Sequence, residues 1–243
     1  MKAKAIKSQH DLKIRAVGSL PPAPGQRRAV LPLSGAERAE LSRLAEIVEY
    51  RTPGSQILGE GEPGRFLFLL ADGLVRTHVT LNDGERQILA FYWPGDLFGL
   101  AEEGTYVATA EAVTPATVYR FPYHDLQQFL TTNPSLQYGF LVKAMHEWRS
   151  AQRQLIVMGR FDVAKRLAIF LLDCSAHEQF FSGEDGLLTL PMTRYDIADY
   201  LGTSAESVTR ALARLEDEGL LKRLSARQLR LDREKLRAYA DFT

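Results

Sequence analysis

The spacing of hydrophobic residues divides the chain into a stretch of short strands with helices on either side. Residues 34–37 form a capping box, which predicts a short helix through Leu41 and Leu44. From Ile47 onward, short apolar runs alternate with turns rich in Gly, Pro, Asn and Asp, as in strands. The runs cover residues 57–58, 66–70, 74–75, 78–79, 87–91 and 117–121. Such regular, short strands predict a compact antiparallel β-roll over residues 29–132.

Helical spacing returns after Pro122. We expect a short helix around residues 125–130, and Pro134 suits the first position of a long helix within residues 133–160. One apolar stripe of this helix recurs in alternating steps of three and four residues, as in a heptad. The stripe consists of Leu141, Ala144, Trp148, Ala151, Leu155 and Met158.

The stripe has two possible partners, the roll of its own chain or a second copy of the helix. A second apolar strip is available for packing on the roll, made of Phe140, Val142, Met145 and Ile156. We therefore expect the first stripe to form the seam of a parallel, two-stranded homodimer.

Two short helices separated by a tight turn are predicted over residues 193–219. Thr193 and Asp196 form a capping box that opens the first helix, and Gly202 supplies the turn. The inner faces of the two helices are Ile197, Ala198, Leu201, Val208, Leu212 and Leu215.

The second helix begins with a cap from Thr203 or Ser204, with Glu206 in the capping-box position. Four side chains near its N-terminus then point outward, Ala205, Glu206, Thr209 and Arg210. These side chains would meet base edges if the helix lay in the major groove of DNA. The pattern therefore predicts a helix-turn-helix.

A basic hairpin follows the second helix directly. Gly219 ends the helix, and residues 220–231 read as two short strands around a turn at residues 225–226. The hairpin carries Lys222, Arg223, Arg227 and Arg230. Many pairs of short helices serve only a structural role and bind nothing. A pair that is followed by a basic hairpin is more typical of a DNA-binding domain. Residues 161–243 are predicted as a winged helix-turn-helix domain.

Length and composition agree with a protein of two globular domains. The chain has 243 residues, of which 45% are hydrophobic, enough for two cores. No apolar run is long enough to span a membrane, and residues 1–28 read as a basic, mobile tail rather than a signal peptide. We therefore expect a cytoplasmic protein. Cys174, the single cysteine, lies in an apolar helical run and is expected to be a buried structural thiol.

Charge alone does not support binding to nucleic acid. The formal net charge is zero, and from Arg160 onward thirteen basic residues face fourteen acidic ones. Attraction of phosphate must therefore be local, at the wing and at the two helix N-termini. The expected phosphate contacts are Thr193, Arg194, Ser204, Ser207, Arg223 and Arg227.

An enzyme is not expected. The sequence has no set of nucleophile, base and orienting residue, no phosphate loop and no metal-ligand spacing. We therefore assign no catalytic residue, no metal and no cofactor.

The order of roll, long helix and winged helix-turn-helix resembles the CRP/FNR superfamily of bacterial transcription regulators. The likeness covers residues 30–240 and includes the turns at residues 61–62, 72–73, 84 and 95–99. Residues 206–210, Glu-Ser-Val-Thr-Arg, resemble the E-x-x-S-R pattern of the FNR and FixK branch. The resemblance implies an α+β fold with a cyclic-nucleotide-binding-like roll. It also implies a homodimeric regulator, classed with activators, that acts on double-stranded DNA with RNA polymerase.

Departures from the family pattern narrow this expectation. Members that bind cyclic nucleotide hold the ribose with a Gly-Glu pair and the phosphate with an Arg-Ser pair. The corresponding positions here are Gly99-Leu100 and Tyr106-Val107, which offer no charge for a buried phosphate. Residues 1–30 also lack the cysteine cluster of FNR-type oxygen sensors. The remaining resemblance is to FixK-type members, which act without a bound effector.

The recognition helix predicts the operator. Arg210 suits guanine O6 and N7, and Glu206 suits a cytosine amino group, so that together they specify a G·C pair. Ala205 offers a methyl contact to thymine, and Thr209 a second such contact or a hydrogen bond. The expected site is TTGAT-N4-ATCAA.

The alternative is a haem- or small-ligand-sensing regulator of the same superfamily. Some members bind haem through a histidine of the roll, and His78 is the candidate here. A visible absorption spectrum distinguishes the two hypotheses.

Overall fold

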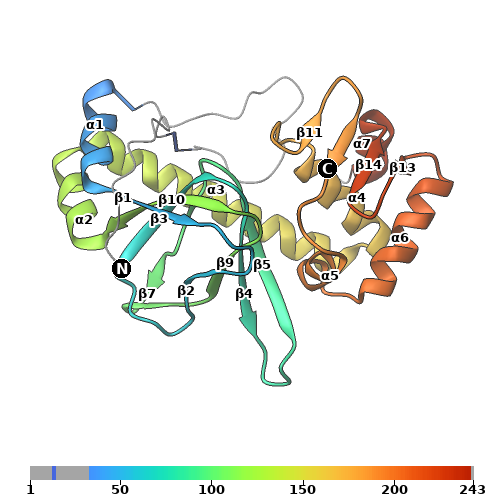
Figure 1. Ribbon diagram of the computed structural model, residues 1–243, viewed down its shortest axis with the longest axis horizontal. Coiled ribbons are helices and arrows are strands. Elements are labelled where there is room, and N and C mark those ends of the chain that lie inside the picture. The colour runs from blue at the N-terminus through green and yellow to red at the C-terminus, as the bar shows by residue number, and fades with distance from the viewer. Residues whose placement is uncertain (1–12, 15–32, 242–243) are drawn as a thin grey trace. The chain divides into compact units, whose positions relative to one another are not determined.

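The computed structural model describes residues 13–14 and 33–241, which form two compact units (Figure 1). The first unit contains residues up to 85 and 89–149, and the second contains 86–88 and 150 onward. The expected N-terminal tail lies outside the described residues except for Lys13 and Ile14. Ile14 is fully buried in a hydrophobic cluster of the first unit, so at least this residue is part of the core.

Strands β1 to β10 form the predicted roll as two antiparallel sheets and a small hairpin. One sheet has the order β1-β10-β3-β6 and the other β2-β9-β4-β5, while β7 pairs with β8. The bounds are β1 Glu46–Tyr50, β2 Gln56–Leu58, β3 Phe66–Asp72, β4 Val75–Thr80, β5 Arg86–Tyr92, β6 Leu97–Phe98, β7 Ala101–Glu102, β8 Thr105–Tyr106, β9 Thr109–Ala112 and β10 Ala116–Pro122. The predicted runs at 74–75 and 78–79 belong to one strand, β4.

Strand β3 separates two hydrophobic clusters, because successive side chains of a strand point to opposite faces. Leu67 and Leu69 belong to the cluster that also contains helix residues, whereas Phe68 and Leu70 belong to the cluster inside the roll. Burial on both faces explains the unbroken apolar run of this strand.

Glycines at the predicted turns allow the roll to close. Gly73 has a φ of +92°, and an added Cβ would lie 2.3 Å from the carbonyl oxygen of Pro115. Gly99 has a φ of +82°, and an added Cβ would lie 2.7 Å from the ring of Phe68. A side chain is therefore excluded at both positions by backbone conformation and by space.

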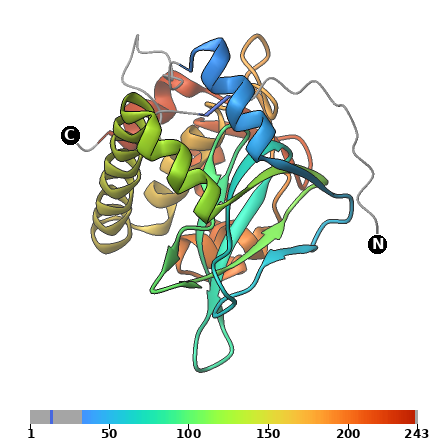
Figure 2. The same ribbon diagram turned by 90° about the vertical axis from the view of Figure 1, so that its left-hand side faces the viewer.

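Three helices accompany the roll. Helix α1 (Gly35–Leu44) opens with the predicted capping box of Ser34 and Glu37. Figure 2 shows α1 in blue and α2 (Tyr123–Thr132) in green on the same side of the roll. Helix α3 (Pro134–Arg160) begins at Pro134 as predicted and contributes residues to both units.

The second unit packs helices on a small antiparallel sheet of order β11-β12-β14-β13. Helix α4 contacts α5, α6 and α7. The bounds are α4 Val163–Cys174, β11 Phe181–Ser182, β12 Leu187–Thr189, α5 Arg194–Leu201, α6 Ala205–Asp217, β13 Leu221–Arg223, β14 Gln228–Leu231 and α7 Arg233–Ala240. Cys174 is buried as predicted, and burial raises the pKa of its thiol. In the described part of the chain, no helix combines the length and apolarity needed to cross a membrane.

Candidate nucleic-acid interface

Helix α5 begins and ends as the sequence predicts. The backbone N–H of Asp196 donates to Thr193 Oγ1 at 3.1 Å, and the backbone N–H of Thr193 donates back to Asp196 Oδ2 at 2.9 Å. Gly202 ends the helix with φ +60°, and an added Cβ would lie 2.8 Å from Met158 Cε. The left-handed backbone of this turn therefore favours glycine, and Met158 is half-buried beside it rather than exposed with the rest of the predicted seam.

The cap of α6 differs in part from the prediction. Ser204 is the N-cap, and its Oγ accepts a hydrogen bond from the backbone N–H of Ser207 at 3.2 Å. The predicted capping box with Glu206 is wrong, because the helix begins at Ala205 and its third position is Ser207. Glu206 is one position too early to close a box with Ser204.

The two faces of α6 separate as expected. Val208, Leu212 and Leu215 are buried, while Glu206, Thr209 and Arg210 are exposed and Ala205 is half-buried. Thr209 Oγ1 donates to the carbonyl oxygen of Ala205 at 2.9 Å. The predicted base-reading residues thus share the solvent-facing side of one helix end.

Glu206 is held in its ionised form. A hydrogen bond from its own backbone N–H lowers the pKa of the carboxyl most, followed by the Ser204 hydroxyl and the nearby charge of Arg210. An ionised carboxylate only accepts hydrogen bonds, which matches the amino group of cytosine.

The wing, strands β13 and β14 with the turn between them, forms as predicted. Its basic side chains differ in whether they already form an ion pair within the chain. Lys222 lies opposite Arg230 in the register of β13 and β14, and both are exposed. Arg223 forms an ion pair with Glu216, whose pKa is lowered by the backbone N–H and the guanidinium of Arg223. Arg227 is exposed, and among the described residues no ion pair involves its side chain.

Arg194 connects the helix-turn-helix to the wing. Its Nη2 donates to the carbonyl oxygen of Ala226 at 3.0 Å, at the turn of the wing. Burial lowers the pKa of this guanidinium, and the charge of Arg223 lowers it further. Arg194 therefore fixes the position of the wing, a role that the sequence alone did not indicate.

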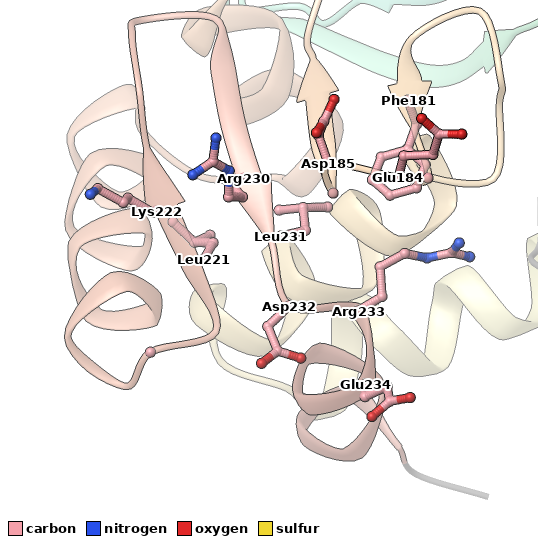
Figure 3. A pocket seen from close by; sticks show the side chains of 13 residues that line it. Phe181, Glu184, Asp185, Leu221, Lys222, Arg230, Leu231, Asp232, Arg233 and Glu234 are labelled. Carbon is pink, nitrogen blue, oxygen red and sulfur yellow. The ribbon is translucent and has the colours of Figure 1, made fainter.

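The hairpin β11–β12 was missed in the sequence. It lines a groove of about 540 Å³ together with β13, β14 and the start of α7. Figure 3 shows the side chains that line this groove. Glu184 and Asp185 occupy the loop between its strands, and Arg233 stacks on the ring of Phe181 with 5.0 Å between the guanidinium carbon and the ring centroid. Gly183 and Gly186 flank these acids and were the available turn signal. The hairpin makes the wing part of a larger sheet, which supports it.

The roll contains a cavity of about 210 Å³ beside the positions that depart from the nucleotide-binding pattern. Leu100, Tyr106 and Val107 all line it, as the sequence comparison predicted. The hydroxyl of Tyr106 is occupied, since it donates to the carbonyl oxygen of Phe66 and accepts from the N–H of the same residue, both at 3.0 Å. The remaining lining residues are Leu58, Thr77, Leu89, Tyr92, Leu97, Phe98, Gly99, Ala108 and Glu147.

Glu147 is the one charged residue among those that line this cavity, and its charge is negative. Its Oε1 lies 2.6 Å from Nζ of the buried Lys143. An anionic phosphate would therefore meet a carboxylate and no positive charge among the residues that line this cavity.

His78, the candidate haem ligand, is buried beside two charged side chains. The residue is 8% exposed, and Nε2 lies 3.4 Å from the carboxylate of Glu111, to which Arg76 donates at 2.7 Å. The residues lining the roll cavity do not include it.

The seam residues of α3 other than Met158 face solvent in this single chain. Leu141 is 56% exposed, Trp148 64% and Leu155 74%, and Ala144 and Ala151 are also exposed. The expectation that Met145 and Ile156 pack on the roll is wrong, because each is 51% exposed. Phe140 does pack on the cluster of the first unit, and Val142 is half-buried.

Comparisons with known proteins cover both units. Residues 165–239 match the Crp-like helix-turn-helix domain, and residues 48–133 match the cyclic nucleotide-binding domain. The transcriptional activatory protein AadR of Rhodopseudomonas palustris is 32% identical over 189 residues, 78% of this chain and 79% of that protein. The nitrogen fixation regulation protein FixK of Rhizobium meliloti is 32% identical over 177 residues, 73% of this chain and 79% of that protein. The structure of FixK2 from Bradyrhizobium japonicum has a TM-score of 0.73 and 32% identity, covering 82% of this chain and 98% of that one.

Proposed function

The chain belongs to the CRP/FNR family of DNA-binding transcription regulators, which are not enzymes, and we propose that it acts as a homodimer on a palindromic operator. One observation carries the proposal: Glu206 and Arg210 stand exposed, four residues apart, at the N-terminal end of a helix whose other face is buried. That arrangement suits insertion into the major groove.

The apolar strip of α3 supports the homodimer. Leu141, Trp148 and Leu155 lie more than half exposed along one helix, and Met145 and Ile156 extend the same surface. A contiguous apolar surface of this kind usually marks an interface. A two-fold axis along the seam would place two recognition helices roughly 34 Å apart, one turn of DNA.

Base contacts then define the half-site. We assign the G·C pair to Arg210, which donates to guanine, and to Glu206, which accepts from cytosine. Thr209 and Ala205 contribute contacts to thymine methyl groups. The operator we propose is TTGAT-N4-ATCAA.

Phosphate contacts fall into two groups. The hydroxyls of Thr193, Ser204 and Ser207 lie at the N-termini of α5 and α6, where free backbone N–H groups attract anions. Arg227, Lys222 and Arg230 present charge from the wing. Arg223 and Arg194 contact phosphate more weakly in this proposal, because Glu216 and the wing carbonyl already hold them.

DNA binding is independent of cyclic nucleotide in this proposal. The roll cavity offers mostly apolar side chains, the hydroxyls of Thr77, Tyr92 and Tyr106 and one carboxylate, and so lacks a cationic partner for a phosphate. Isothermal calorimetry tests this point. We expect no heat of binding with cyclic AMP or cyclic GMP at micromolar concentration, whereas binding coupled to a tighter operator complex would overturn it.

Activation of transcription is the output we propose, with RNA polymerase as partner and the cytoplasm as location. Two similar proteins carry the names activatory protein and activator protein, which supports the direction of regulation.

Selection of bound sequences from random duplex DNA tests the proposed function. We expect an inverted repeat with one G·C pair in each half and a separation of about one helical turn. Recovery of unrelated sequences, or of a single unrepeated half-site, would overturn the proposal.

A further inference from the structure

The guanidinium of Arg210 is hydrogen-bonded before any DNA is present. Its Nη2 donates to Ser207 Oγ at 2.8 Å, from one turn further along the same helix. Ser204 Oγ donates to the same Ser207 oxygen at 3.1 Å and itself accepts from the backbone N–H of Ser207 at 3.2 Å. The capping residue, Ser207 and Arg210 thus form one chain of hydrogen bonds.

A count of donors and acceptors shows what this chain leaves free. A serine hydroxyl has two lone pairs and one proton. One lone pair of Ser207 accepts from Arg210, and its oxygen also lies against Ser204 Oγ, whose hydroxyl lowers the pKa of Glu206. Arg210 uses one of its five N–H donors on Ser207 and keeps the others for a guanine edge.

An exposed arginine normally samples many rotamers, and ordering them on binding costs free energy. A hydrogen bond from the guanidinium to a residue three positions earlier restricts that sampling. The restriction keeps the guanidinium on the face of α6 that also carries Glu206.

We propose that Ser207 is a specificity-determining positioning residue, which holds Arg210 ready to read guanine. The inference rests on the proposed function and deepens it. It differs from a simple phosphate contact, because loss of a phosphate contact weakens all sequences alike, whereas loss of positioning weakens the preference for the G·C pair.

The test is competition binding with the full-length chain on two duplexes, the proposed operator and the same duplex with the G·C pair of each half-site changed to A·T. The ratio of the two dissociation constants measures discrimination at that pair. We expect Ser207→Ala to reduce the ratio about three- to tenfold, and Ser207→Thr, which keeps the hydroxyl, to restore it. Thr203→Ala is the control, since it removes a hydroxyl at the same turn that is not hydrogen-bonded to Arg210, and we expect its ratio to be unchanged.

A double substitution sharpens the result. If Ser207 acts through Arg210, Ser207→Ala adds no further loss of discrimination in an Arg210→Ala background. A Ser207→Ala variant that weakens both duplexes equally overturns the positioning role. Absence of discrimination in the unmodified chain would instead overturn the proposed operator reading. Circular dichroism checks that each variant keeps its helix content.

Discussion

At the scale of single residues, Arg210 has the most specific expected effect. Replacing it with alanine removes the donors for guanine and leaves the buried face of α6 untouched. We expect Arg210→Ala to cost about 1–3 kcal/mol of binding free energy per half-site and to relax the preference at the G·C pair. Single-base operator variants measure this in competition. Full discrimination retained by the variant would show that another residue reads the pair.

Asp173 gives the stability of the second unit a pH dependence. Burial raises the pKa of its carboxyl to about 8, with Arg153 acting in the opposite direction, and among the described residues Oδ1 has no hydrogen-bond partner. An unfolded aspartate has a pKa of about 3.9, so between roughly pH 4 and pH 8 the folded chain binds the extra proton. The free energy of unfolding therefore falls as pH rises through this range.

Asp173→Asn should remove that dependence. We expect the variant to be more stable at pH 8 by about 1–3 kcal/mol, since it has no carboxylate to bury, and to show a flatter profile from pH 4 to 8. Urea unfolding across this range measures it. Asp217→Asn, at an exposed position of α6, is the control. Parallel profiles for Asp173→Asn and the unmodified chain would contradict the assignment.

The face of a helix on which a side chain lies could be predicted from the sequence, because it follows helix periodicity. Contacts that depend on side-chain rotamers could not. The outward position of Glu206 and Arg210 follows from the buried spacing of Val208, Leu212 and Leu215. The capping box predicted for α6 was wrong because Thr203 and Ser204 can both cap a helix. Moving the cap by one residue changes which side chain stands at the third position of the helix. The bond between Arg210 and Ser207 depends on side-chain rotamers, which sequence spacing does not specify.

At the scale of elements, α3 is expected to hold the dimer together. Leu155 is 74% exposed, more than Leu141 or Trp148, and a charge there would have to be desolvated on association. We expect Leu155→Asp to be monomeric at micromolar concentration by light scattering and to lose operator affinity. Leu155→Met keeps an apolar side chain and should remain dimeric. The role of the seam would be contradicted if the unmodified chain were a monomer and Leu155→Asp bound the operator with unchanged affinity.

The wing should contribute affinity without sequence preference. Arg227 is exposed, so Arg227→Ala should lower the affinity for all duplexes alike. It should also reduce the slope of log affinity against log salt concentration by about one released counterion. Arg223→Ala should reduce it less, because Glu216 already neutralises that guanidinium. Dissociation constants over a series of salt concentrations measure both slopes. A change in base preference in Arg227→Ala would contradict this account.

Elements with strong periodicity or clear caps were predicted, and short strands of small residues were missed. Helices α1, α3, α5 and α6 begin at recognisable caps or at a proline. Strand β9 has the sequence Thr-Ala-Glu-Ala, whose buried residues are alanines and so give little apolar signal. Strands β6, β7, β8 and β11 have two residues each, too few for a periodic pattern.

At the scale of the whole molecule, we expect attraction of DNA phosphate to depend on where the charges lie rather than on the net charge. The chain has thirty basic and thirty acidic residues, yet the wing presents Lys222, Arg227 and Arg230 together. Family membership accounts for the order of the domains, and Leu100, Tyr106 and Val107 line a cavity whose lining has no cationic side chain for a phosphate. The signal that controls such a regulator is therefore expected to act on its abundance rather than on this cavity.

The central claim is that two copies of the chain read one palindromic operator. The most direct measurement is a titration at stoichiometric concentration of a labelled TTGAT-N4-ATCAA duplex, beside a duplex with one half-site scrambled, without cyclic nucleotide. We expect two chains per duplex on the intact site and an affinity for the scrambled duplex at least about 100-fold lower. One chain per duplex with equal affinity for both duplexes would contradict the account.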